Sequence, residues 1–128
     1  MNKIANDKVI YPELSYQIMQ AVYEVHNKLG PGFTEDIYEE ATVIELEVLG
    51  LIVERQKSIE VIYKGKAIGK FRIDLVVEGK IILELKAVTA LNDVFKQQLL
   101  SYLKATDLRL GILINFGSKR VESVRIVN

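Results

Sequence analysis

Two apolar segments separated by a polar turn constrain the fold of this chain more than any other feature of its sequence. Within 71–77 and 81–87 the odd positions are apolar, and Glu78-Gly79-Lys80 lies between the two segments. Alternation with a period of two is typical of β-strands that bury one face. An antiparallel hairpin that buries both odd sets together must bring Leu75 near Leu83.

This register also fixes the other cross-strand neighbours of the hairpin. It pairs Ile73 with Leu85 on the buried face, and on the opposite face it pairs Asp74 with Glu84 and Arg72 with Lys86. A two-residue turn would place the two carboxylates on different faces, so the pattern predicts a three-residue connection or a bulge. We therefore expect Asp74 and Glu84 to lie side by side.

Adjacent carboxylates repel each other unless one is protonated or a cation lies between them. Their hard oxygen ligands suit Mg²⁺ or Mn²⁺. Lys86 projects from the same face as Glu84, where an ammonium can hold a water and stabilise charge that develops on a phosphate. The alternative is a solvated strand face on which Asp74, Glu84, Arg72 and Lys86 form cross-strand ion pairs.

Helical spacing of apolar residues dominates the first fifty residues. It predicts a helix from Glu13 to Leu29, which Gly30-Pro31-Gly32 ends. A second helix is expected after Thr34, whose hydroxyl can accept from a backbone amide, and Gly50 ends it. Its expected buried stripe comprises Ile37, Ala41, Ile44 and Val48.

The remaining sequence predicts strands around one further helix. We expect strands near 52–63, 67–77 and 81–87, a helix near 92–105 capped by Asn92, a strand buried on both faces within 108–116, and a last strand near 121–127. The order α-α-β-β-β-α-β-β predicts an α/β fold of the α+β type, a mixed sheet flanked by helices.

Composition sets broad limits on the class of protein. The 128 residues, 49% of them hydrophobic, predict a single domain over 1–128, with 1–10 as a flexible N-terminal segment. The 17 basic and 17 acidic side chains cancel, so the net charge neither favours nor excludes a polyanionic partner. The chain has no cysteine and one histidine, which argues against thiolate and multi-histidine metal sites. No segment resembles a signal peptide or a membrane span, so a cytoplasmic protein without membrane contact is expected.

The order of elements and motifs resembles the PD-(D/E)XK nuclease superfamily, also called restriction-endonuclease-like. Its members share a helix, a three-stranded meander that carries Asp and then Glu-x-Lys, a helix and a further strand, and the match runs from about Gly32 to Phe116. Ile73 stands where the superfamily name has proline. More narrowly, Gly32 to Tyr38 is similar to the signature of the GxxExxY family, as is the stretch Val25 to Gly32 before it.

The resemblance implies a metal-dependent nuclease. Asp74 and Glu84 would be metal ligands, the Leu85 carbonyl a third, and Lys86 the catalytic lysine; Glu35 would join them from the second helix. The ion would be Mg²⁺ or Mn²⁺, and the substrate a phosphodiester bond of DNA or, second, RNA. Without the resemblance, Glu35 would be interpreted as a helix N-terminal acid that interacts with the dipole.

Four further residues are supporting candidates. Tyr38 could orient Glu35 or approach substrate, or could simply pack. Gln98 and Tyr102 resemble the QxxxY element of several nuclease families, although a polar pair at a helix edge is the alternative. His26 is expected to be a hydrogen-bonded histidine in the core or beside the site rather than a ligand.

Basic side chains could contact phosphates or could only keep the surface soluble; they are Lys57, Lys64, Lys66, Lys70, Arg72 and Lys96. Two other functions stay open from the sequence. One is a catalytically inactive nuclease-fold module that binds nucleic acid or a protein, and the other is a structural protein whose acids only form ion pairs. A homodimer is likewise an open alternative.

Overall fold

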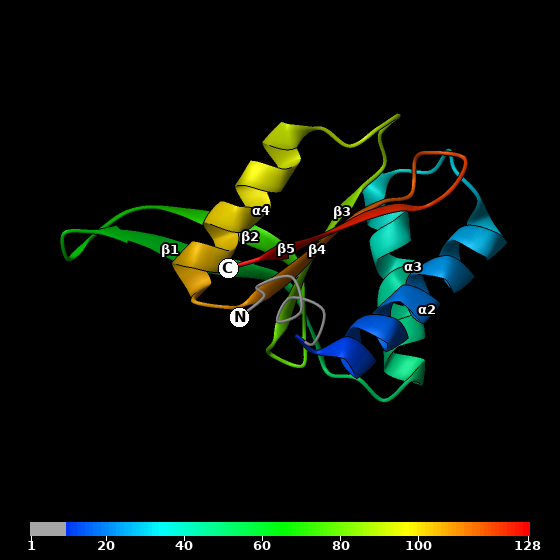
Figure 1. Cartoon of the computed structure of the whole chain (residues 1–128), viewed down its shortest axis with the longest axis horizontal. Coiled ribbons are helices and arrows are strands. Elements are labelled where there is room, and N and C mark those ends of the chain that lie inside the picture. Colours follow the sequence, from blue (N-terminus) through cyan, green and yellow to red (C-terminus); the bar gives the residue numbers. More distant parts are fainter. Residues whose placement is uncertain (1–9) are drawn as a thin grey trace, which may run out of the picture.

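A computed structural model describes residues 10–128 of the chain (Figure 1). Within that range the elements are α2 (Pro12–Leu29), α3 (Glu35–Val48), β1 (Val53–Tyr63), β2 (Lys66–Val77), β3 (Ile81–Lys86), α4 (Asp93–Thr106), β4 (Leu110–Asn115) and β5 (Glu122–Val127). The predicted order of helices and strands is confirmed. Of the segment 1–10 that was expected to be flexible, Ile10 is buried in the core, and residues 1–9 lie outside the described part.

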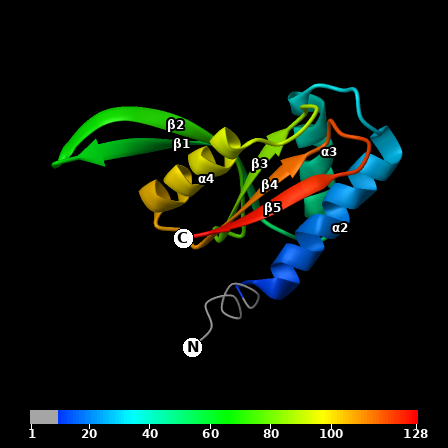
Figure 2. The same cartoon turned by 45° about the horizontal axis from the view of Figure 1, so that its top comes forward.

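The strands form one mixed sheet in the order β1-β2-β3-β4-β5. β3 and β4 are parallel, and the other neighbours are antiparallel. Parallel neighbours need a crossover connection, and α4 provides it. Helices α2 and α3 cover one face of the sheet and α4 covers the other. The outer end of the β1–β2 hairpin extends past these helices, away from the rest of the protein (Figures 1 and 2).

The apolar side chains form two clusters, one on each face of the sheet. The cluster on the α2/α3 face includes Ile18, Val22, Leu46, Leu75, Val77, Leu83, Leu85 and Ile112. The cluster on the α4 face includes Ile73, Val76, Ile82, Leu99, Leu103 and Leu113. Gly111 lets α4 approach β4, because a Cβ at that position would lie 2.7 Å from Leu99 Cδ1. The expected N-cap of α4 is confirmed, since Asn92 accepts a 3.2 Å hydrogen bond from the Phe95 amide.

The predicted buried stripe of α3 is wrong. Ile37, Ile44 and Val48 are exposed by 40%, 57% and 76%, and Ala41 is only partly buried. The buried side chains are Tyr38, Thr42, Val43 and Leu46. Positions 38, 42 and 46 form a stripe at the same helical spacing, but it contains a hydroxyl at two of its three positions. A count of apolar residues therefore favoured the wrong side of the helix.

The hairpin register is confirmed at its turn and differs further along. Leu75 pairs with Leu83 and Val77 with Ile81, which leaves the predicted three-residue connection between the strands. Ile73 does not lie beside Leu85, because the two side chains pack in clusters on opposite faces. The side chains of β2 change from the α4 face to the α2/α3 face of the sheet between Ile73 and Leu75. Gln56, which lies across from this step on β1, has a left-handed φ of 48°.

Candidate active site

Asp74 and Glu84 lie where the β2–β3 ladder ends. The Asp74 amide donates a 2.9 Å hydrogen bond to Glu84 Oε2, and the Leu85 amide donates one of 2.8 Å to Asp74 Oδ2. Each carboxylate thus replaces a backbone acceptor of the neighbouring strand. The two acids are side by side, as the alternation predicted, although the contact runs through side chains and backbone rather than through a regular ladder pair.

Burial makes both carboxyls hard to ionise, and the charge of Asp74 adds to this effect at Glu84. Glu84 is only 5% exposed, and burial followed by the charge of Asp74 raises its pKa to about 8. Burial is also the main cause that raises the pKa of Asp74, against the lowering effect of its hydrogen bond from Leu85. A bound cation would oppose both effects, because it favours the charged form of each carboxyl.

Lys86, at the end of β3, is close to both acids. Its charge lowers the pKa of Asp74 and of Glu84, which partly offsets the effect of burial. Its Nζ lies 4.7 Å from the centre of the Phe95 ring, a cation–π arrangement that α4 supplies. Cross-strand ion pairs are not formed: among residues 10–128, neither Lys86 nor Arg72 has a carboxylate oxygen within 4.0 Å.

Glu35 is the first residue of α3 and lines a cavity of about 450 Å³. The cavity is lined by Glu35, Asp36, Glu39, Gln56, Asp74 and Leu85. The charge of Glu35 raises the pKa of Asp74 and of Glu84, so the helix faces the acid pair. Thr34 occupies the predicted N-cap position, but its hydroxyl donates to Asp36 Oδ1 instead of accepting from an amide.

Sequence reasoning misses three residues at or beside this cavity, namely Glu39, Arg55 and Gln56. Glu39 is one helical turn after Glu35, and its charge also raises the pKa of Asp74. Arg55 binds both Glu39, at 3.1 Å, and Glu40, at 2.5 Å, and Gln56 Nε2 donates to Glu39 Oε1 at 2.5 Å. The i, i+4 spacing of two glutamates on α3 was the available signal.

Tyr38 and His26 belong to the core. Tyr38 is fully buried; its hydroxyl donates to the Gly30 carbonyl at 2.5 Å and accepts from the Phe33 amide at 3.2 Å. His26 Nε2 donates to the Ser118 carbonyl at 3.1 Å. Both rings stack on Phe116, with centroids 4.6 Å and 6.5 Å from its ring. Tyr38 thereby fixes the loop that leads into Glu35, and neither residue is among those that line the acidic cavity.

The two α4 candidates are placed differently from each other. Tyr102 stacks on Phe71 with 4.1 Å between ring centroids, and burial first, then the charges of Glu84 and Asp74, raises its pKa. Its phenol is therefore close to the acid pair. Gln98 is exposed one turn earlier on the same helix, with no side-chain hydrogen bond within the described part of the chain.

The donor set suits a hard divalent cation. Asp74 and Glu84 each use one carboxylate oxygen in the hydrogen bonds above, which leaves Asp74 Oδ1 and Glu84 Oε1 as donors. Leu85 and Glu35 lie on the same cavity. Within residues 10–128, however, three or more acidic or histidine side chains do not converge on one point, so the residues present supply a two-carboxylate site.

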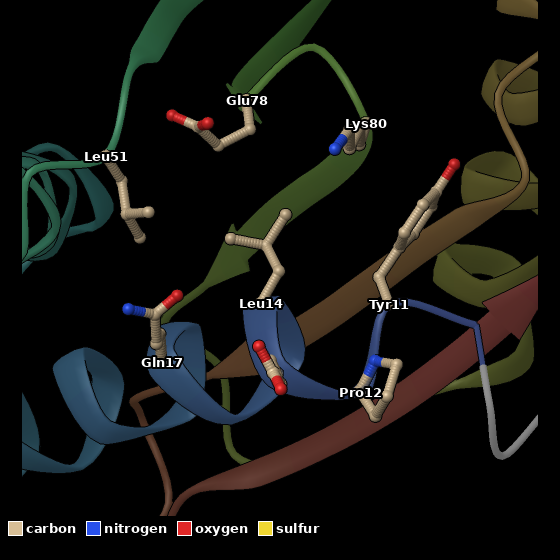
Figure 3. Close-up of a pocket in the computed structure, with 8 residues that line it drawn as sticks. Tyr11, Pro12, Leu14, Gln17, Leu51, Glu78 and Lys80 are labelled. Carbon is tan, nitrogen blue, oxygen red and sulfur yellow. The ribbon is translucent and has the colours of Figure 1, made fainter.

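A separate cavity lies at the turn end of the β2–β3 hairpin (Figure 3). It measures about 400 Å³ and is lined by Tyr11, Pro12, Glu13, Leu14, Gln17, Leu51, Glu78 and Lys80. None of the residues predicted for the site lines it. Glu78 has a structural role there, because its carboxylate accepts a 2.6 Å hydrogen bond from the Ile52 amide.

Comparison with known proteins identifies the family. The sequence model of the PD-(D/E)XK nuclease superfamily matches residues 12–127, which is nearly all of the chain. The chain belongs to the PD-(D/E)XK nuclease superfamily. The α+β architecture, with helices on both faces of a mixed sheet, is consistent with the restriction-endonuclease-like fold of this superfamily.

One solved structure supports the fold of this superfamily member. The chain is similar to the crystal structure of SSO0001, with a TM-score of 0.56 and 21% sequence identity. The similarity covers 94% of this chain and 61% of SSO0001, so the chain spans less than two thirds of that protein. No curated protein matches the sequence. Within residues 10–128, no helix is long and apolar enough to cross a membrane.

Proposed function

We propose that this member of the nuclease superfamily is a metal-dependent nuclease that hydrolyses phosphodiester bonds of DNA. The observation that carries the proposal is the contact between the half-buried Asp74 and the buried Glu84, two carboxyls with raised pKa values beside Lys86 and an open cavity. Acidic groups whose burial disfavours ionisation are stabilised by a cation, and such groups cluster at functional sites.

Asp74 and Glu84 would hold Mg²⁺ or Mn²⁺ through their free oxygens, with the Leu85 carbonyl and Glu35 as further donors. When bound, the ion supplies a water of lowered pKa and stabilises charge on the phosphate. Lys86 would hold the attacking water and stabilise the phosphoryl oxygens as charge develops on them. Hydrolysis adds one water across a P–O bond and leaves a phosphomonoester on one product and a hydroxyl on the other.

Tyr102 would border the bound strand. Its ring is held by Phe71, and its phenol lies near the acid pair. A neutral phenol can donate a hydrogen bond to a phosphate oxygen without adding charge to the site. Gln98, exposed one turn away on α4, would contact the substrate further from the acids.

Lys86→Ala tests the proposal. We expect loss of Mn²⁺-dependent cleavage of plasmid DNA by roughly 100-fold or more, with an unchanged melting temperature and retained Mn²⁺ binding. Lys80→Ala, in the turn just before β3, is the control and should cleave like the wild type. Cleavage that survives in purified Lys86→Ala would contradict the proposal.

A second candidate is a nuclease-fold module without catalysis that binds nucleic acid or a protein. The absence of a third converging carboxylate within residues 10–128 favours it. Metal binding distinguishes the two functions, because a non-catalytic module does not need a metal ion. Mn²⁺ binding at millimolar concentration that is lost in Asp74→Asn supports the nuclease, whereas wild-type protein without Mn²⁺ binding supports the module.

A further inference from the structure

The β1–β2 hairpin concentrates the positive charge of a chain that is neutral overall. Its residues 57–72, here called the arm, contain five basic side chains, Lys57, Lys64, Lys66, Lys70 and Arg72, and one acid, Glu60. The arm therefore has a net charge of +4, and the rest of the chain −4, because the total is zero. The charge is separated in space as well, since the arm extends away from the body of the protein (Figures 1 and 2).

Most of this charge is not neutralised within the protein. In the described residues, the arm forms one ion pair, between Lys57 and Glu54 at 3.2 Å. Lys70 stands opposite Glu60 in the strand register, but the two do not approach within 4.0 Å. The Lys64 ammonium lies 5.6 Å from the centre of the Tyr63 ring, near the tip. Four basic groups are thus available to an anionic partner.

The arm has the shape of a two-stranded antiparallel ribbon with a free outer end. Its base is packed, where Phe71 stacks on Tyr102 and Ile59 contacts the cluster on the α4 face. Near the tip, Ile62, Tyr63 and Ile68 are exposed. The major groove of B-form DNA admits a two-stranded ribbon of this kind, whereas the major groove of an RNA duplex is too narrow and deep for side chains to enter.

The arm also leads directly to the acid pair. Arg72 lies two residues before Asp74 on β2, a distance of about 7 Å along an extended strand, and Lys70 lies about 13 Å away. A DNA strand whose phosphates contact these side chains would continue toward Asp74 and Glu84. A duplex held by the arm would therefore have one of its strands at the cavity.

We infer that the arm binds double-stranded DNA by entering its major groove and that it guides one strand to the acid pair. The guiding role rests on the proposed nuclease function, and the binding itself does not. Contacts to phosphates by Lys64, Lys66, Lys70 and Arg72 provide affinity, and the exposed apolar tip contacts base edges in the groove.

Fluorescence anisotropy with a labelled 20-base-pair DNA duplex, in EDTA to prevent cleavage, tests the inference. We compare the wild type with the triple variant Lys64→Gln, Lys66→Gln, Lys70→Gln. The control variant removes the same charge elsewhere, through Lys28→Gln, Lys119→Gln and Arg120→Gln at the end of α2 and in the β4–β5 turn. Circular dichroism checks that both variants are folded.

We expect the arm variant to bind the duplex at least about 10-fold more weakly at 100 mM salt, with a log–log salt slope smaller by roughly 2 to 3. The control variant should keep an affinity within about 3-fold of the wild type. Equal losses in the two variants would overturn the inference. So would equal or tighter binding of the wild type to single-stranded DNA or to an RNA duplex of the same length.

Metal binding separates failure of this inference from failure of the proposed function. The arm variant should bind Mn²⁺ like the wild type, because none of its substitutions touches Asp74 or Glu84. Loss of duplex binding with retained Mn²⁺ binding supports the arm as the DNA contact. Unchanged duplex binding in the arm variant overturns the inference even when the protein cleaves DNA.

Discussion

Asp74 and Glu84 are joined through the backbone of their two strands: the Asp74 amide donates to Glu84 Oε2 at 2.9 Å, and Asp74 Oδ2 accepts from the Leu85 amide at 2.8 Å. The acids that would hold a metal therefore also complete the hydrogen bonding of the sheet where its ladder ends. Substitutions at these positions affect both stability and metal binding, so each must be followed by two separate measurements.

The stability of the metal-free protein should fall as pH rises from 5 to 9. The pKa of Glu84 is raised to about 8 in the folded protein from its ordinary value of 4.5, so the folded state binds more protons than the unfolded state between these values. The contribution of Glu84 protonation to the free energy of unfolding is on the order of a few kcal/mol. It is complete below pH 4.5 and is lost as pH rises through 8. Urea unfolding in EDTA at several pH values measures it.

Glu84→Gln should flatten this pH dependence, because the amide does not titrate. The raised pKa of Asp74 leaves a smaller slope of the same sign. Glu47→Gln, on an exposed part of α3, is the matched control and should keep the wild-type slope. A wild-type stability that rises between pH 5 and 9 would contradict the burial of Glu84 in its protonated form.

Tyr38→Phe should destabilise the protein by roughly 1–3 kcal/mol. The substitution removes the hydroxyl that serves the Gly30 carbonyl and the Phe33 amide, and unpaired polar groups in a protein interior cost this much. Tyr23→Phe, at an exposed position of α2, should change the free energy of unfolding by less than about 0.5 kcal/mol. Equal effects of the two substitutions would show that the buried hydroxyl does not hold the loop.

Asn115→Ala should cost roughly 2–4 kcal/mol of unfolding free energy. Asn115 is fully buried on β4; its Oδ1 accepts from the amides of Val88 and Gly117, and its Nδ2 donates to the Val88 carbonyl and to Glu122, each at 2.9 Å. The substitution leaves several of these groups without partners. Asn92→Ala, which removes only an exposed helix cap, should cost about 1 kcal/mol.

The same Asn115 network holds the segment that follows Lys86. Gly117 permits the close approach, because a Cβ there would lie 2.4 Å from the Val88 carbonyl oxygen. We therefore expect Asn115→Ala to lower cleavage as well as stability, measured below the melting temperature of the variant. Full cleavage in a destabilised variant would show that Lys86 is positioned by β3 alone.

Local patterns predicted the fold because most of its elements have strong local signals. The three-residue turn at 78–80 and the cap at Asn92 follow from neighbouring residues alone. The buried side of α3 does not, since Thr42 is buried and Ile44 exposed only because of how α3 meets α2 and the sheet. The change of face at Asp74 lies across from Gln56, which has a left-handed φ and is remote in sequence.

The candidate site likewise contains some features that follow from the local sequence and others that depend on tertiary contacts. The adjacency of Asp74 and Glu84 could be derived from alternation, because burial specifies the register of a hairpin. The cluster of Glu39, Arg55 and Gln56 could not, since it joins a helix to an edge strand through long polar side chains. Nothing in the local sequence fixes which of several such side chains meet.

An Mn²⁺ soak of crystals of the full chain tests the central claim most directly. An anomalous difference map should contain a peak between the carboxylates of Asp74 and Glu84, and the peak should be lost in Asp74→Asn crystals treated identically. A wild-type map without a peak at this position, or an equal peak in the variant, would contradict the account.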